Sequence, residues 1–408
     1  MAMITIDCGR FCHGPAVAEA VAQRLGSVVL TDEAVFLAVA ERFSVVPEKL
    51  RRTVYGPESF FGGLTREKVR NVAYLRAGFA DAVTGDDTVY CGLGGHLLPS
   101  SLTHVLKVCL GGSHAYRAER AAEEGLSKRE AERAIRKDDE IRAEWIDLLW
   151  GRGPWDKSLY DLFLPMQETT VEEAVDTICD LAGQPALAVS ELAVSAMEDF
   201  RLAAAVNVIL AEKGHDVDVV ACDGRAEVLI KKHAVFLERV QHELASIASE
   251  VEGVSEATAR PGPLYREPGI SFNVDLDVPS KVLLVDDERE FVHTLSERLQ
   301  ARSMAPAVAY DGEEALALVE SDEPEVMVLD LKMPGIDGIE VLRRVKRSHP
   351  ATEVIILTGH GSDAEETLAG EIGAFAYLRK PVDIDVLTET MKAAYHKVNE
   401  ARGPGAGD

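Results

Sequence analysis

The chain has 408 residues, of which 47% are hydrophobic and 27% are charged, so it is long enough for two or three separately folded domains. Asp and Glu total 69 against 43 Lys and Arg, and the formal charge of -26 disfavours sequence-independent binding to nucleic acids or anionic membranes. The six cysteines form no Cys-x-x-Cys pair, which indicates reduced thiols rather than a disulfide framework or a zinc site. The sequence shows neither a signal peptide nor an apolar stretch of membrane-spanning length, so we expect a cytoplasmic protein without membrane insertion.

Clusters of proline and glycine near residue 183 and over residues 261–269 divide the chain, and the pattern of apolar residues changes between them. We therefore predict an α/β chain with three folded domains. The predicted boundaries are 1–183 for the first domain, 189–261 for the second, 262–280 for a linker, 281–398 for the third domain and 399–408 for a tail.

The first domain is predicted to open with a strand over residues 4–6, a turn and a helix. The turn from Gly9 to Gly14 has the glycine spacing of a phosphate-binding loop, whose full form is Gly-x4-Gly-Lys-Ser/Thr. Pro15 and Ala16 occupy the lysine and hydroxyl positions, so the loop lacks the cation and the magnesium ligand of a catalytic phosphate-binding loop.

Two further buried strands, over residues 88–95 and 105–110, are followed by arginine-bearing helices and by Tyr160-Asp161-Leu162. In this order, after the opening strand and turn, the elements resemble a cytidylate-kinase-like domain over about the first 181 residues. The resemblance implies a parallel sheet of the P-loop-kinase type and transfer of a phosphoryl group from ATP to a nucleoside monophosphate.

Three positions depart from the pattern of that family. Pro15 replaces a basic residue, Thr31-Asp32 replaces an acid and an arginine, and Leu93 replaces an arginine. Because phosphoryl transfer depends on cations around the moving phosphoryl group, these changes predict a degenerate, pseudokinase-like domain.

Arg117 and Arg142 match lid-type positions of the same family. Together with Gly9 and Gly14 they form the candidate site for a nucleotide or another anion. The alternative is that both arginines form surface pairs with nearby glutamates on their own helices.

The second domain is predicted as a small α+β fold. A helix over residues 200–213 precedes a strand pair, a helix over 236–251 and a last strand, and Asp223-Gly224 favours a tight reversal between the paired strands. This order resembles a BON domain, a likeness that implies a fold but assigns no site.

The third domain alternates strands and helices five times, which is typical of a parallel sheet covered on both faces. Its apolar strands are followed by polar residues: Asp286-Asp287 after the first, Asp330 after the third, Thr358 after the fourth and Lys380 after the last. Ligands bind beyond the C-terminal strand ends of such sheets. Three converging carboxylates repel one another, so the pattern predicts a hard divalent cation and favours Mg²⁺.

Asp330 is the candidate nucleophile for a phosphoryl group, because a cation beside its carboxylate would screen the incoming negative charge. Lys380 would then pair with the phosphoryl group, Thr358 would donate a hydrogen bond to it, and Tyr377 would repack. The predicted metal residues are Asp286, Asp287, Asp330 and Lys332.

These motifs, with the segments 329–335 and 377–381, resemble a two-component response-regulator receiver domain over about residues 281–397. The resemblance implies a flavodoxin-like, doubly wound sheet in the strand order 2-1-3-4-5. It also implies phosphoryl transfer from a histidine kinase to Asp330, a cis peptide before Pro381, and output through the face around the fourth helix.

We therefore expect a phosphorelay response regulator, phosphorylated on Asp330 by a partner histidine kinase or phosphotransfer protein, with the first domain as a sensing or interaction module. No helix-turn-helix follows Lys397, so we expect no DNA partner and an output through an unknown protein target. The alternative is an enzyme, an ATP-dependent nucleoside-monophosphate kinase of the cytidylate type whose activity is gated by phosphorylation of the third domain.

Overall fold

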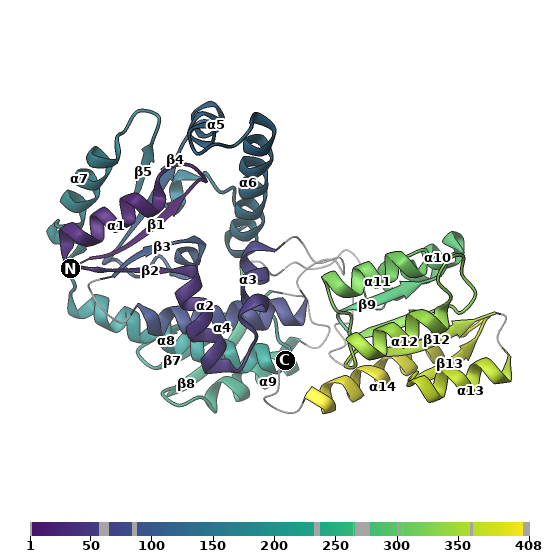
Figure 1. The fold of residues 1–408 in the computed structure, drawn as a ribbon. Helices are drawn as coiled ribbons and strands as arrows, with labels where there is room; N and C mark the ends of the chain where they lie inside the picture. Colours follow the sequence, from purple (N-terminus) through teal and green to yellow (C-terminus); the bar gives the residue numbers. More distant parts are fainter. Residues whose placement is uncertain are drawn as a thin grey trace. The chain divides into compact units, whose positions relative to one another are not determined.

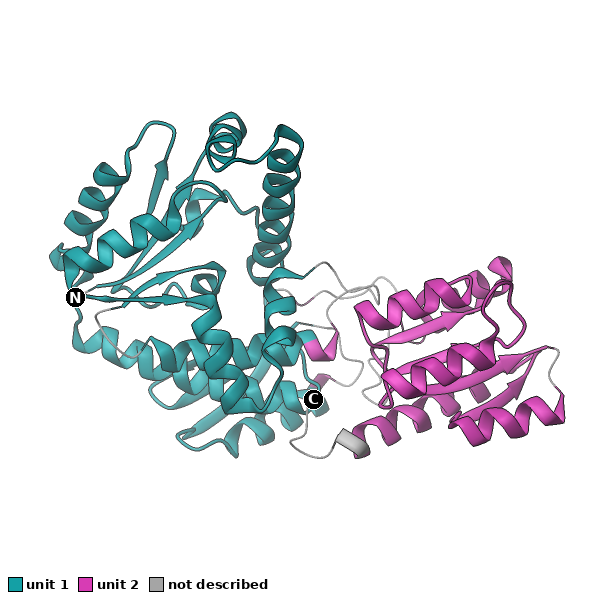
Figure 2. Ribbon diagram, viewed as in Figure 1, with its two compact units in different colours: residues 1–57, 68–231, 238–264 teal, residues 58–67, 232–237, 265–408 magenta. Residues whose placement is uncertain are grey.

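The chain forms two compact units, shown in Figure 2. The first contains residues 1–57, 68–231 and 238–264, and the second contains residues 58–67, 232–237 and 265–408. The computed structural model describes residues 2–56, 65–83, 88–231, 237–263, 265, 278–300, 302, 304, 306–359 and 362–402. Most of the predicted linker and of the predicted tail lies outside these residues. No helix among them is both long and apolar enough to cross a membrane.

The first unit is built on a sheet of five parallel strands in the order β2-β3-β1-β4-β5 (Figure 1). The strands are β1 Met3–Cys8, β2 Val28–Thr31, β3 Thr88–Cys91, β4 Val105–Gly111 and β5 Leu162–Pro165. Side chains alternate along a strand, so Met3 enters the core on one face of the sheet and Ile4 enters the core on the other.

Helices cover both faces of this sheet. One core holds α1 and α7, and the other holds α2, α3, α4 and α6, while α5 packs against α6. A capping box formed by Ser127 and Glu130 begins α6, and Gly151 ends it at a φ of 62°. The helices are α1 Gly14–Leu25, α2 Asp32–Phe43, α3 Pro47–Tyr55, α4 Arg66–Ala82, α5 His114–Glu123, α6 Lys128–Trp150 and α7 Val171–Ala182.

The middle segment contains the predicted order of elements. These are α8 Glu191–Glu212, β6 Val217–Cys222, β7 Arg225–Ile230, α9 Leu237–Ser249 and β8 Glu256–Pro261. β6 and β7 are antiparallel around Asp223 and Gly224, which have φ angles of 51° and 78°, and β8 pairs in parallel with β7. α8 contributes Met197, Phe200 and Val208 to a core of the first domain, so the two segments fold as one compact unit.

The second unit is a five-stranded parallel sheet in the order β10-β9-β11-β12-β13, which is the predicted order 2-1-3-4-5. One core holds α11, α12 and α13, and the other holds α10 and α14. The peptide before Pro381 is cis, as the resemblance implied. The elements are β9 Val282–Val285, α10 Arg289–Gln300, β10 Ala307–Ala309, α11 Gly312–Ser321, β11 Val326–Leu329, α12 Gly338–Ser348, β12 Glu353–Thr358, α13 Asp363–Ile372, β13 Ala376–Arg379 and α14 Ile384–Arg402.

Candidate functional site

A cluster of carboxylates lies at the C-terminal edge of the second sheet. β9 and β11 are parallel neighbours, so Asp286 and Asp287 after β9 lie beside Asp330 after β11. One oxygen from each of the three carboxylates lies within 4.8 Å of the others. Asp286 and Asp330 are buried, whereas Asp287 is exposed. The geometry is therefore that of an acidic pocket with one side open to solvent.

Lys380 is the cation of this pocket. Its Nζ donates to Asp286 Oδ2 at 2.5 Å, to Glu288 Oε1 at 3.2 Å and to Asp330 Oδ2 at 3.3 Å. Burial lowers the pKa of Lys380, but the bond to Asp286 and the nearby carboxylates outweigh this effect and raise it. Burial also raises the pKa of Asp286, and Lys380 offsets only part of that rise. One lysine is therefore bonded to three carboxylates.

The two oxygens of Asp330 have different environments. Oδ1 accepts the main-chain N–H of Leu331 at 2.7 Å and that of Lys332 at 3.4 Å, whereas Oδ2 faces Lys380. Gly338, at the start of α12, approaches this loop so closely that a Cβ there would lie 2.2 Å from the Asp330 carbonyl oxygen. Glycine at this position lets α12 begin directly against the acidic pocket.

The remaining predicted residues of the second unit lie around the same edge. Thr358 ends β12 and is buried, and its carbonyl oxygen accepts the N–H of Lys380 at 2.9 Å. The Tyr377 hydroxyl is buried and has no hydrogen-bond partner among the described residues. The Lys332 ammonium pairs with Glu365, so only the main chain of Lys332 faces Asp330.

Two residues of this pocket were not predicted from the sequence. Glu288 directly follows the two predicted acids and is the third carboxylate bonded to Lys380. Phe291, one turn into α10, places its ring 4.3 Å from Lys380 Nζ, a cation–π geometry. The run of three consecutive acids was a signal for Glu288, but no pattern in the sequence indicates Phe291.

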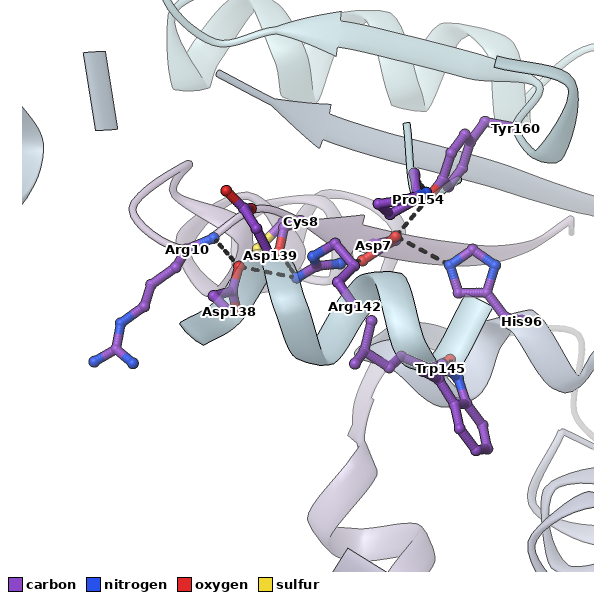
Figure 3. A network of polar contacts seen from close by, with 12 residues as sticks. Asp7, Cys8, Arg10, His96, Asp138, Asp139, Arg142, Trp145, Pro154 and Tyr160 are labelled. Atoms are coloured by element: carbon purple, nitrogen blue, oxygen red, sulfur yellow. Dashed lines mark hydrogen bonds and ion pairs between the residues drawn. The ribbon is translucent and has the colours of Figure 1, made fainter. Parts of the chain in front are cut away.

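The second candidate site is the loop after β1 in the first unit, shown in Figure 3. Phe11 and His13 have positive φ angles of 68° and 59°, which fold the chain tightly between Gly9 and Gly14. The main-chain N–H of Arg10 donates to Asp138 Oδ2 at 3.0 Å, while the Arg10 side chain points away from the network (Figure 3). A carboxylate from α6 is therefore bonded to the loop.

Arg117 is buried in this network, with 3% of its side chain exposed. Its Nη1 donates to both oxygens of Asp139, at 2.8 and 3.0 Å, and its Nη2 donates to Asp138 at 3.3 Å. Its Nε donates to the carbonyl oxygen of Arg10 at 3.0 Å. The alternative of a surface pair with glutamates is wrong for this arginine, because Arg117 is itself buried and its partners are the aspartates Asp138 and Asp139.

Arg142 is buried as well, at 5% exposed, and donates to Asp7 Oδ1 and to the carbonyl oxygen of Cys8. The other oxygen of Asp7 accepts the Tyr160 hydroxyl at 2.7 Å and lies 3.0 Å from His96 Nε2 (Figure 3). The surface-pair alternative is wrong here too. Asp7, which the sequence analysis did not single out, is the centre of this network.

Two of the residues that depart from the kinase pattern, Asp32 and Leu93, contact each other. Asp32, buried, accepts the N–H groups of Leu93 at 2.8 Å and Gly94 at 2.9 Å, and the hydroxyls of Tyr55 and Tyr90. Burial raises the pKa of Asp32 in spite of these four donors. Asp32, the first residue of α2, is therefore bonded to Tyr90 in β3 and to the main chain just after β3, a structural role that needs no ligand.

Three thiols lie near the loop. Burial raises the pKa of Cys12 to about 11 and that of Cys91 to about 12, and it raises the pKa of Cys8 further. A thiolate is the reactive form of cysteine, so burial disfavours the reactive form of these three groups.

Comparison with known proteins separates the two units. Residues 282–392 match the response regulator receiver domain, and residues 3–168 match the cytidylate kinase-like family. The second unit contains a receiver domain. The match in the first unit covers its parallel sheet and the loop after β1.

Three similar proteins illustrate the receiver match. Response regulator MprA of Mycolicibacterium vanbaalenii is 34% identical over 128 residues, which are 31% of this chain and 55% of that protein. Transcriptional regulatory protein CpxR of Klebsiella pneumoniae is 40% identical over 114 residues, 28% of this chain and 48% of that protein. This chain therefore spans about half the length of these relatives. The receiver domain of the Francisella response regulator 1452 is 31% identical, with 29% of this chain and 98% of that chain covered and a TM-score of 0.28.

Proposed function

We propose that the chain is a phosphorelay response regulator whose phosphoryl group is carried by Asp330, with a histidine kinase or phosphotransfer protein as donor. The observation that supports this is the acidic pocket of the second unit, in which three carboxylates meet within 4.8 Å and Lys380 contacts the carboxylate at its centre. The receiver match over residues 282–392 agrees with this proposal.

The pocket fits Mg²⁺, because its donors are carboxylate oxygens from Asp286, Asp287 and Asp330, and the two buried groups share a single lysine among the described residues. The main-chain N–H of Lys332 donates to Asp330, and its carbonyl oxygen would be the remaining ligand of the proposed metal set. When bound, the ion supplies the positive charge that lets three carboxylates and a phosphoryl group share one pocket.

The geometry supports separate tasks for the residues. Oδ2 of Asp330 attacks phosphorus, because Oδ1 is held by two main-chain N–H groups. A P–O bond to Asp330 forms as the P–N bond of the donor phosphohistidine breaks, and the freed imidazole takes up a proton. Lys380 then exchanges Asp286 for the phosphoryl oxygens, Thr358 donates a hydrogen bond to them, and Tyr377 repacks beside Thr358.

The test is phosphorylation of the full chain by acetyl phosphate with Mg²⁺, followed by borohydride trapping and mass spectrometry. We expect one modification, at Asp330, which Asp330→Asn and chelation of the metal both abolish. Asp337→Asn is the matched control, because Asp337 is exposed, lies in the same loop and caps α12, a task that asparagine also performs. Modification of Asp330→Asn, or its loss in Asp337→Asn, would contradict the assignment.

For the first unit we propose a non-catalytic output module that senses a ligand or contacts a protein. The support is the loss of the lysine and hydroxyl at Pro15 and Ala16 and the pairing of Arg117 and Arg142 with aspartates. The net charge of -26 favours a protein target over DNA. The likeness of the middle segment to a BON domain stays a prediction.

The competing proposal, a nucleoside-monophosphate kinase gated by the receiver, makes a different prediction in a coupled assay. ATP and CMP should give negligible turnover if the first unit is non-catalytic, with or without acetyl phosphate. Turnover in the range of about 1 to 100 per second, which is typical of kinases, would establish the enzyme instead.

A further inference from the structure

A carboxylate of the chain itself, that of Asp138, is bonded to the loop between Gly9 and Gly14. Main-chain N–H groups of such glycine loops are the donors that bind phosphate groups in other proteins. Here the N–H of Arg10 donates to the carboxylate of Asp138 at 3.0 Å. The same oxygen lies 3.3 Å from Arg117 Nη2 and 3.6 Å from Arg142 Nη2. One main-chain donor and two guanidinium groups therefore surround one carboxylate oxygen.

We propose that Asp138 is an internal occupant of this anion site and prevents it from binding the phosphate groups of nucleotides and other polyphosphates. The proposal deepens the function proposed for the first unit and rests on it, because it gives a physical reason for a non-catalytic loop. The ligand class that the site excludes is a phosphate ester or polyphosphate, since these carry the charge and the oxygen acceptors that Asp138 supplies.

The surroundings of the loop agree with a closed site. Trp155 lies against Gly9, where a Cβ would approach its ring to 3.1 Å. The same ring lies 5.9 Å from the Arg117 guanidinium carbon and 5.7 Å from that of Arg142. The indole therefore covers both arginines and the first residue of the loop.

The local charges explain why a phosphate group does not displace the carboxylate. Three aspartates, Asp7, Asp138 and Asp139, already share the two arginines. A phosphate group added beside them would meet three negative charges and only two positive ones. The site nevertheless retains a donor for an added ligand, because the buried Nε of Arg142 has no hydrogen-bond partner among the described residues.

The substitution Asp138→Asn removes the charge and keeps the shape. Each arginine retains a carboxylate in this variant, since Arg117 keeps both oxygens of Asp139 and Arg142 keeps Asp7. The Asp138 side chain is also 24% exposed, so its neutralisation leaves no buried cation without a partner. We therefore expect the variant to fold.

The experiment titrates inorganic pyrophosphate into the full chain by isothermal calorimetry without divalent metal. We expect Asp138→Asn to bind pyrophosphate at least about tenfold more tightly than the wild type, a difference of about 1.4 kcal/mol. Asp147→Asn is the matched control, because Asp147 is exposed on the same helix and its loss changes the net charge equally. Equal affinities of Asp138→Asn and Asp147→Asn, or tight binding by the wild type, would overturn the proposal.

A second measurement needs no variant. Hydrogen exchange of the wild-type chain should show protection of the Arg10 amide, since its hydrogen is bonded to Asp138. Rapid exchange of this amide would overturn the proposal even if Asp138→Asn did not fold. Pyrophosphate binding and amide exchange are also independent of CMP turnover, so turnover would refute the non-catalytic module while these two measurements judge the role of Asp138.

Discussion

Replacing Asp7 by asparagine should test the charge network of the first unit. The carboxylate is buried between Arg142, His96 and Tyr160. Burial alone would raise its pKa, but the Arg142 guanidinium and the contacts with His96 and Tyr160 outweigh burial and hold the pKa of Asp7 well below its ordinary range. Asp7→Asn keeps the shape of the side chain and removes the charge that all three partners face.

The cost follows from what the substitution leaves behind. Breaking a buried ion pair by removing one partner costs about 3–5 kcal/mol, because the other charge stays buried. Arg142 keeps Asp138 at 3.6 Å, which favours the lower end of that range. We therefore expect the free energy of unfolding to fall by about 3 kcal/mol, a large share of the roughly 5–15 kcal/mol that stabilises a typical domain.

Urea denaturation followed by tryptophan fluorescence measures this loss in the intact chain. The only tryptophans of the sequence are Trp145, Trp150 and Trp155, all in the first unit, so the signal does not report the receiver domain. Asp176→Asn is the control, because Asp176 pairs with Arg24 on the surface and is 57% exposed. Such pairs contribute less than about 1 kcal/mol.

The dependence of the stability loss on pH tests the same reasoning. A carboxyl group whose folded pKa is lowered stabilises the fold above its unfolded pKa of about 3.9, and this stabilisation is lost as the pH falls towards the folded pKa. The gap between the wild type and Asp7→Asn should therefore be full at pH 7 and shrink by about 1.4 kcal/mol per pH unit well below pH 4. A loss below about 1 kcal/mol at pH 7, or a gap that stays constant down to pH 2.5, would refute the reasoning.

Two further predictions concern the second unit, where circular dichroism follows unfolding. Asp287→Ala should weaken Mg²⁺ binding in calorimetry yet change the metal-free free energy of unfolding by less than about 0.5 kcal/mol, because Asp287 is exposed; a larger loss would mark it as a structural partner. Tyr377→Phe removes a buried hydroxyl without a partner among the described residues, so stability should hold or rise by up to about 1 kcal/mol, and a clear loss would show that the hydroxyl is bonded.

The acidic pocket was predictable because its residues follow from the strand pattern, while the resemblance to a receiver domain supplied the strand order. β9 and β11 are short, fully buried apolar runs, and each is followed directly by acids. Parallel strands bring their C-terminal ends to one edge, so any order in which these two are neighbours places Asp286 beside Asp330. Lys380 lies at the same edge, because it directly follows β13, the last parallel strand of the sheet. Only the residue types and the strand order were needed.

The first unit was less predictable because its decisive contacts are long-range and electrostatic. Arg10 and Asp138 are 128 positions apart, and Asp7 and Arg142 are 135 apart, so no local periodicity relates them. A charged residue within the buried strand β1 was the one available signal, since a charge in a core needs a partner. The sequence could not show which of the many arginines that partner is.

The middle segment shows a different limit. Proline and glycine near residue 183 predicted a domain boundary, and the elements after it were found in the predicted order. α8, however, starts at Glu191, nine residues before the predicted helix, and its first turns supply Met197 and Phe200 to a core of the preceding domain. A helix with apolar residues on more than one face can pack against two neighbouring parts of the chain. The turn residues before α8 therefore do not separate the first domain from the middle segment.

The two candidate sites differ in how their buried charges are balanced. In the second unit Lys380 is bonded to three carboxylates and Asp287 lies beside them, so negative charge exceeds positive charge in the pocket. A divalent cation would compensate this excess, as the proposed phosphorelay requires. In the first unit each arginine already has its own aspartate, and Asp138 lies between the two arginines. Buried charges must be compensated, and a site whose compensation is internal has little demand for a ligand. This difference in charge balance is the physical basis of both proposals, in which the receiver pocket binds a cation and a phosphoryl group while Asp138 occupies the loop after β1.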